Sequence, residues 1–196
     1  MYNKIVVPLD GSDLAEVALP HVAAIGKGCS VPQVLLVSVT QPIKARVSSR
    51  IVAGEYDARD YHVAPAGGPI PTGNYLTGLL YSPDMKNIKS IPAEVGKMAK
   101  TAWNYLSKKA EELEQQGLHT EIRVAFGHPA EEIIRFAEDE KADLIIMGSR
   151  GRSGFNQWDM GNIADKVIRS VNVPVLLLKP QSGFKETKPK RRGQPS

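Results

Sequence analysis

Short apolar runs and stripes of apolar residues at helical spacing alternate along most of the chain. Residues 4–9 form the first run, which is rich in β-branched residues, and a helical stripe from Leu14 to Ile25 follows it. A second run, residues 34–39, is continuous rather than alternating at its centre, which is typical of a parallel strand that helices cover on both faces. Pro20 lies inside the helical stripe, so we expect it to kink that helix or weaken one of its hydrogen bonds.

The same alternation returns in the second half of the chain. A long helical stripe begins at Ala93 and ends near Gly117, a residue type that commonly follows the end of a helix. A strand is predicted next, over residues 118–126, and a helix begins at residue 129. Two further strands, 143–147 and 174–178, are separated by a helix over residues 162–171. This order predicts the α/β class: a five-stranded doubly wound parallel sheet with helices on both faces, Rossmann-like or flavodoxin-like.

Residues 41–92 interrupt the alternation. They contain six prolines, five glycines and four of the six tyrosines, and no helical or strand period is visible in them. A connection of this length is rare inside a compact domain, so we expect either a functional arm or lid or a mobile segment. The tyrosines favour packing against a surface, because solvated linkers contain few aromatic residues. The predicted organisation is one domain over residues 1–180, with this insertion and a separate tail over residues 181–196.

The charge of the chain is concentrated in that tail. The whole chain has 25 Lys and Arg against 21 Asp and Glu, a formal net charge of +4. Residues 181–196 hold five of the basic residues and one acidic residue, so the remainder is formally neutral. A neutral folded part gives no reason to expect nucleic acid as a partner, apart from a weak, salt-sensitive contribution of the tail. We expect the tail to be solvated and disordered.

Membrane and exported classes are not favoured. No apolar run approaches the roughly 18 residues of a membrane-spanning helix. The residues before Pro8 are too few for the apolar core of a signal peptide. Cys29 is the single cysteine, which excludes an intrachain disulfide and suits a reducing compartment. We therefore expect a cytoplasmic protein without a membrane partner.

The predicted fold directs attention to the loops after the first and fourth strands, because ligands bind where the strand order reverses. The loop after the fourth strand, residues 148–154, reads Gly-Ser-Arg-Gly-Arg-Ser-Gly, and Gly161-Asn162 starts the next helix. Glycines let backbone N–H groups approach a polyphosphate, and Arg150 and Arg152 could neutralise its charge. The alternative is that these glycines only shape a loop, since their spacing is neither the Rossmann nor the Walker pattern.

Asp10 follows the first strand and so falls at the other candidate loop. Its carboxylate could accept hydrogen bonds from a ribose or an amide. It could equally form only an Asx-type turn with Gly11 and Ser12. The residue pattern leaves both readings open.

Three segments together resemble the universal stress protein family: residues 6–12, residues 127–131, and residues 145–151 with 173–176. The resemblance covers residues 1–40 and 93–180, and residues 41–92 are longer than we expect for the family. Its most specific element is the ATP-binding pattern Gly-x2-Gly-x9-Gly followed by Ser, Thr or Asn. Four residues meet that pattern: Gly148, Gly151, Gly161 and Asn162.

The resemblance implies a fold of the adenine-nucleotide-binding type, ATP as ligand, and a homodimer joined through the last strands. Mg²⁺ could accompany the ATP. The resemblance also implies an adenosine end, a middle and a phosphate end for the site. By this resemblance Asp10 and Val39 would contact the adenosine end, and Met147 would line the adenine or ribose region. Gly148 and Gly151 would lie along the nucleotide, and Gly161, Asn162 and Ile163 would hold phosphates. Pro8 and Arg150 complete the set of expected nucleotide-binding residues.

No residues for catalysis are predicted. The four histidines are scattered, and neither a Gly-x-Ser-x-Gly elbow nor a Cys–His pair is present, so we predict no catalytic residue and no metal ligand. The leading hypothesis is a regulatory or sensor dimer of the stress response, in which ATP binding changes contacts with protein partners that the sequence does not identify.

Two alternatives stay open. Asp159 lies between Gly151 and Gly161, where its charge would oppose phosphates unless it faces away or binds Mg²⁺. One alternative is therefore a slow Mg²⁺-dependent ATPase or phosphotransferase that uses Asp10 and Asp159. The other is a nucleotide-independent interaction module that uses residues 41–92.

Overall fold

Six strands form one sheet in the computed structural model, which describes residues 2–40, 79–81, 93–150 and 160–179. Their order across the sheet is β3-β4-β2-β1-β5-β6. The strands are β1 (Lys4–Pro8), β2 (Gln33–Thr40), β3 (Leu79–Tyr81), β4 (Thr120–Phe126), β5 (Leu144–Gly148) and β6 (Val175–Leu178). Neighbouring strands run parallel except β3, which pairs antiparallel with β4. The five predicted parallel strands are confirmed.

β3 lies inside the segment in which the sequence showed no strand pattern. Its register pairs Leu79 with Phe126 and Tyr81 with Val124. A strand of 3 residues is too short to show a period of two, so its pairing with β4, rather than a local pattern, defines it. The expectation of no strand in this segment is therefore wrong at β3. The predictions for residues 41–78 and 82–92 lie outside the described residues.

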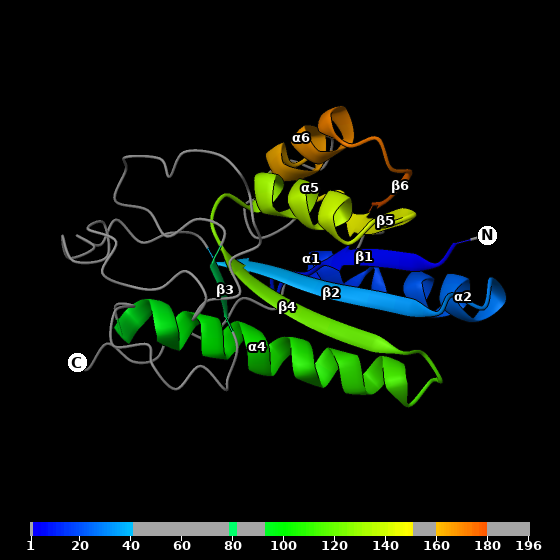
Figure 1. Ribbon diagram of the computed structural model, residues 1–196, viewed down its shortest axis with the longest axis horizontal. Helices are drawn as coiled ribbons and strands as arrows, with labels where there is room; N and C mark the ends of the chain where they lie inside the picture. The colour runs from blue at the N-terminus through cyan, green and yellow to red at the C-terminus, as the bar shows by residue number, and fades with distance from the viewer. Residues whose placement is uncertain (1, 41–78, 82–92, 151–159, 180–196) are drawn as a thin grey trace, which may run out of the picture.

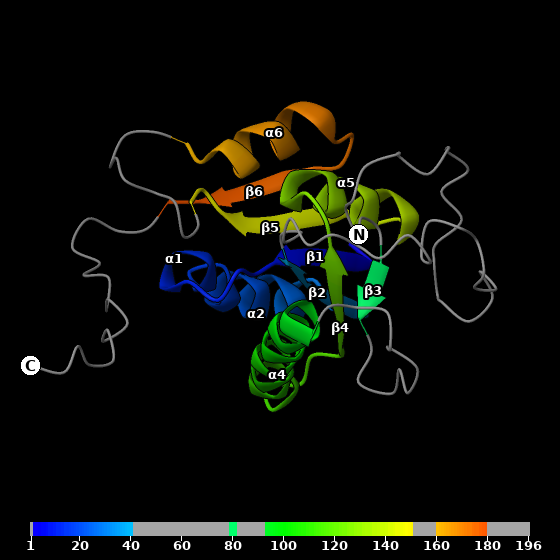
Figure 2. The same ribbon diagram turned by 90° about the vertical axis from the view of Figure 1, so that its left-hand side faces the viewer.

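Helices cover both faces of the sheet (Figure 1, Figure 2). On one face lie α1 (Asp13–Glu16), α2 (Leu19–Gly28) and α4 (Ala93–Glu114); on the other lie α5 (Pro129–Asp139) and α6 (Asn162–Ser170). This arrangement confirms the doubly wound fold, in which right-handed crossovers place helices on opposite sides of the sheet. Among the described residues, no helix combines the length and the apolar character needed to cross a membrane.

The predicted first helix is divided in two around Pro20. α1 ends at Glu16 and α2 begins at Leu19, so that Pro20 falls in the first turn of α2. A proline there removes an N–H that would have no partner within the helix in any case. The expected kink is therefore a break between two helices. The last turn of α2 leads to Ser30, which has φ +51°.

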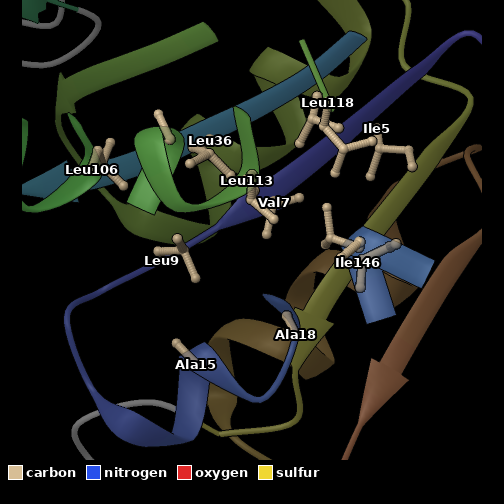
Figure 3. Packing of buried hydrophobic residues seen from close by; sticks show 14 of the residues in the cluster. Ile5, Val7, Leu9, Ala15, Ala18, Leu36, Leu106, Leu113, Leu118 and Ile146 are labelled. Carbon is tan, nitrogen blue, oxygen red and sulfur yellow. The ribbon is translucent and has the colours of Figure 1, made fainter. Parts of the chain in front are cut away.

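The core is built in two layers because the strands are apolar on both faces. Ile5 and Val7 of β1 belong to the cluster beneath α2 and α4, whereas Val6 between them belongs to the cluster beneath α5 and α6. Figure 3 shows the first layer, with Leu106 and Leu113 of α4 reaching toward the sheet. The continuous apolar runs of the sequence thus reflect strands that are covered twice.

The strand order places a reversal beside β1. The chain passes from β1 to β2 and β4 on one side, then returns to β5 on the other side of β1. The loops after β1 and β5 consequently leave the sheet in opposite directions from neighbouring strand ends. In open parallel sheets this is where ligands bind. The two loops singled out from the sequence are the two at this position.

Candidate functional site

The carboxylate of Asp10 closes the turn after β1. Its Oδ1 accepts hydrogen bonds from the backbone N–H of Ser12 at 3.0 Å and from the Ser12 hydroxyl at 2.5 Å. Gly11 between them has φ +79°, a left-handed conformation that costs glycine little. The Ser12 Oγ also accepts from the N–H of Ala15 at 3.2 Å and so caps α1. The Asx-type turn therefore exists, and the ligand role predicted for Asp10 stays a prediction beside it.

Gly148, the last residue of β5, packs against the backbone of α1. A Cβ at this position would lie 2.5 Å from the carbonyl oxygen of Leu14 and 3.3 Å from the Cα of Ala15. No side chain fits there without moving α1. The loops after β1 and β5, predicted to lie on the same edge of the sheet, are thus in direct contact through Gly148.

The segment after β5 is closed at its base by main-chain hydrogen bonds. The N–H of Ser149 donates to the carbonyl oxygen of Leu178 at 2.7 Å, and the N–H of Gly161 donates to the carbonyl oxygen of Ser149 at 2.8 Å. A Cβ on Gly161 would lie 3.1 Å from that same Ser149 oxygen. The start of α6 is therefore held close against the end of β5.

The N-terminus of α6 has the features of an anion-binding end. Gly161 is its N-cap and supplies no side chain to satisfy the first N–H groups. Asn162 is exposed and Ile163 is half-buried. Asp165 in the first turn would oppose an anion, but its Oδ1 accepts a hydrogen bond from the Nε of Arg169 at 2.8 Å. The N-terminal N–H groups, with the partial positive charge of the helix, can receive a phosphate.

The residues predicted for the adenosine end follow from three strands. Pro8 ends β1 opposite Val37, and Val39 lies near the end of β2, where it is half-buried. Met147 is only 5% exposed and belongs to the core layer beneath α5 and α6, which Val39 also contacts. Met147 thus stabilises the floor of this region more than it lines its surface.

The middle of the glycine loop lies outside the described residues. Gly151, Arg152 and Asp159 fall in residues 151–159, so the roles predicted for them stay predictions. Arg150 is half-buried at the edge of this segment. In the ranges that the structure describes, no group of three or more His, Cys, Asp or Glu side chains is placed to hold a metal ion.

One polar cluster beside these loops was not predicted from the sequence. The hydroxyl of Tyr105 on α4 donates to Glu16 Oε1 on α1 at 2.9 Å, and the Nζ of Lys109 pairs with Glu16 Oε2 at 2.9 Å. Burial raises the pKa of Tyr105, and the hydrogen bond to Glu16 raises it further. The sequence gives only a weak signal of this cluster. Tyr105 and Lys109 are four residues apart and so lie on the same face of one helix, but their common partner, Glu16, is remote in the chain.

Comparison with known proteins adds to this geometry. The sequence model described as "Universal stress protein family" matches residues 78–179. Universal stress protein MJ0577 of Methanocaldococcus jannaschii is 32% identical over 180 residues, which cover 91% of this chain and 96% of that protein. A solved structure of MJ0577 has a TM-score of 0.64 and 28% identity, and the match covers 92% of this chain and 98% of that one.

Two further solved structures share the fold. A universal stress protein from Archaeoglobus fulgidus, in complex with dAMP, has a TM-score of 0.51 and 20% identity over 90% of this chain and 97% of its own. A universal stress protein in complex with cAMP has a TM-score of 0.52 and 16% identity, and the match covers 91% of this chain and 97% of that one.

Proposed function

Since the chain belongs to the universal stress protein family, we propose that it binds an adenine nucleotide, ATP first among the candidates, where the strand order reverses. The nucleotide would lie across the ends of β1 and β5. Its phosphates would face the N-terminus of α6, and its adenosine would face the turn at Asp10. The fold supports this placement because nucleotides bind at such reversals in related sheets.

The single observation that carries the proposal is the joining of three segments at Gly148, Ser149 and Gly161. Gly148 contacts α1, and Ser149 receives the N–H of Gly161 at 2.8 Å. A Cβ would crowd the backbone at both glycines, at 2.5 Å from Leu14 O and 3.1 Å from Ser149 O. The two ends of the proposed site are therefore held together by close backbone contacts, which exclude a side chain at Gly148 and leave little room for one at Gly161.

Each end of the site has chemistry suited to part of a nucleotide. Asp10 would accept hydrogen bonds from the ribose hydroxyls. Pro8 and Val39 would be the apolar surroundings of the base, with Met147 buried beneath them. Asn162 and Ile163 would present backbone N–H groups to phosphate at the N-terminus of α6. Arg150 and Gly151 would follow the phosphate chain, and the side chain of Arg150 would offset its negative charge.

The ligand class agrees with what two relatives bind. The dAMP complex and the cAMP complex are both universal stress proteins that hold an adenine nucleotide. The shared component of these two ligands is an adenine nucleoside with phosphate. Adenine nucleotide binding is therefore the function that we propose for this chain, with Mg²⁺ as an optional companion of ATP.

We further propose that two copies associate along β6. β6 is the last strand of the sheet and pairs only with β5 among the described strands. All four residues of β6 are half-buried, and Ile168 of the adjacent α6 is 38% exposed. An apolar edge strand of this kind is a natural surface for pairing with a second strand.

In the proposed role, a cytoplasmic dimer uses bound nucleotide to change its contacts with other proteins during stress. The domain would span residues 1–180, with residues 41–92 as its insertion and residues 181–196 as its tail. Mass spectrometry of the small molecules released when freshly purified protein is denatured tests the proposal. Release of ATP, ADP or AMP is expected, whereas absence of any adenine nucleotide together with no calorimetric ATP binding would overturn it.

A further inference from the structure

The short helix α1 joins the two loops of the proposed site. It has 4 residues, too few to be stable as an isolated helix. At its start, the Ser12 hydroxyl donates to Asp10 and also caps the helix. In its middle, the carbonyl oxygen of Leu14 fills the space beside Gly148. α1 therefore connects the Asp10 turn to Gly148, in addition to the pairing of β1 with β5.

The far end of α1 is held by both oxygens of one carboxylate. Glu16 Oε1 accepts the Tyr105 hydroxyl at 2.9 Å, and Glu16 Oε2 pairs with Lys109 Nζ at 2.9 Å. Lys109 pairs in turn with Glu112 at 3.2 Å. Two partners on separate oxygens restrict the carboxylate more than one partner would, because neither bond can rotate without straining the other.

This cluster is partly withdrawn from water. The side chain of Lys109 is 15% exposed and that of Glu16 is 28% exposed, so solvent screens the pair less than an ordinary surface ion pair. Burial is the largest cause that raises the pKa of Tyr105. The hydrogen bond to Glu16 and nearby negative charges, including that of Asp10, raise the pKa further. The phenol therefore stays protonated and donates its hydrogen bond at cellular pH, close to the Asp10 turn.

α4 supplies a fixed reference for this cluster. Leu106 between the two partners is fully buried, and Ala110 and Leu113 also belong to the core layer that α4 covers. Figure 3 shows Leu106 and Leu113 directed toward the sheet and Ala15 of α1 at the margin of the same layer. Glu16 thus attaches a marginal helix to a long, well-packed one.

We propose that Glu16, Tyr105 and Lys109 are positioning residues of the nucleotide site. They hold α1 against α4, so that the Asp10 turn and Gly148 keep the spacing that an adenosine moiety requires. The inference rests on the proposed nucleotide-binding function. The three side chains act through α1 and need no contact with the nucleotide.

Calorimetric ATP affinities of single variants test this role. Tyr105→Phe removes the hydroxyl and keeps the ring that packs on the core, so the variant should fold. Its affinity should fall on the order of tenfold, the range expected when a coupled contact is removed. Lys109→Met should act in the same direction. Lys108→Met, at an exposed neighbouring position on α4, is the matched control and should bind ATP as the wild type does.

A double-mutant cycle separates positioning from a general loss of stability. If Tyr105 acts through the Asp10 turn, Tyr105→Phe should weaken binding less in an Asp10→Asn background than in the wild type, whereas independent losses would add. Equal losses in both backgrounds, or unchanged affinity of both Tyr105→Phe and Lys109→Met, would overturn the positioning role while nucleotide binding stood. Failure of the wild type to bind ATP would instead overturn the proposed function, and the positioning role with it.

Discussion

The N–H of Gly161 donates to the carbonyl oxygen of Ser149 at 2.8 Å, and this bond brings the start of α6 to the end of β5. The first N–H groups of α6 therefore lie beside the strand ends where the sheet order reverses. Asp10 reaches the same edge from β1. Residues that are far apart in the chain can in this way serve the two ends of one nucleotide.

Substitution of Gly161 should weaken nucleotide binding more than it affects folding. In Gly161→Ala the new Cβ would lie 3.1 Å from Ser149 O, so the start of α6 must move by a small fraction of a bond length. We expect ATP affinity, measured by calorimetry, to fall about tenfold, or ~1.4 kcal/mol. Gly28→Ala is the matched control, because nothing lies within 4 Å of the added Cβ. Equal ATP affinities for these two variants would contradict the role of Gly161.

Gly148 should behave differently, because its neighbour is rigid backbone. A Cβ there would lie 2.5 Å from the carbonyl oxygen of Leu14. Because this oxygen is a backbone atom, no side-chain rotation can relieve the clash, and α1 or β5 would have to move. We expect Gly148→Ala to lower the free energy of unfolding by about 1–3 kcal/mol, as overpacking does in protein cores. Urea denaturation followed by circular dichroism measures this. An unchanged midpoint would show that α1 does not pack against Gly148 in solution.

A pH dependence of stability is expected at the opposite end of the central strands, where β1 and β5 begin. Asp143 Oδ2 accepts the N–H of Asn3 at 2.6 Å and that of Lys4 at 3.0 Å, and these bonds hold the pKa of the carboxyl below its usual range. A depressed folded pKa stabilises the protein above the unfolded pKa of about 3.9, and this contribution is lost as the pH falls through the folded value.

Wild type should therefore exceed Asp143→Asn in unfolding free energy at neutral pH. The difference should be small, because the group is partly exposed, and it should shrink as the pH falls below about 4. Urea titrations at a series of pH values measure it. A difference that grows as the pH falls would contradict the stated direction.

The proposed association along β6 can be tested at the backbone. The carbonyl oxygens of Pro174 and Leu178 accept from β5, so by alternation along a parallel strand the N–H of Leu177 points away from β5. Leu177→Pro removes that N–H and should convert a dimer to a monomer, whereas Leu177→Val keeps it and serves as control. Light scattering during gel filtration measures the mass. A Leu177→Pro protein that remained a folded dimer would exclude pairing through this edge.

The sequence predicted most of the fold because its signals are local. Continuous apolar runs such as residues 34–39 indicate strands covered on both faces, and β2 over Gln33–Thr40 confirms that prediction. β3 was missed because its 3 residues depend on pairing with β4. The division of the first helix was only half predicted, since Pro20 signals a disturbance without fixing whether the helix bends or restarts.

The candidate site shows a different limit. Glycine spacing indicates that another group comes close to the backbone, but it does not identify that group. At Gly148 the group is α1 of the same chain. The contact between Glu16 and Tyr105 joins residues that are remote in the chain, and such a pairing depends on tertiary packing rather than on any local pattern. Asp10 illustrates a third case, in which the observed turn and the proposed ligand role involve the same carboxylate.

Amide hydrogen exchange with and without ATP tests the central claim most directly, because it locates the nucleotide as well as detecting it. The account predicts slower exchange on ATP addition in residues 10–16 and 160–163, which meet where the sheet order reverses. Residues 141–144, at the opposite end of β5, should be unchanged. Absence of any ATP-dependent protection, or protection confined to segments away from these loops, would contradict the proposed site.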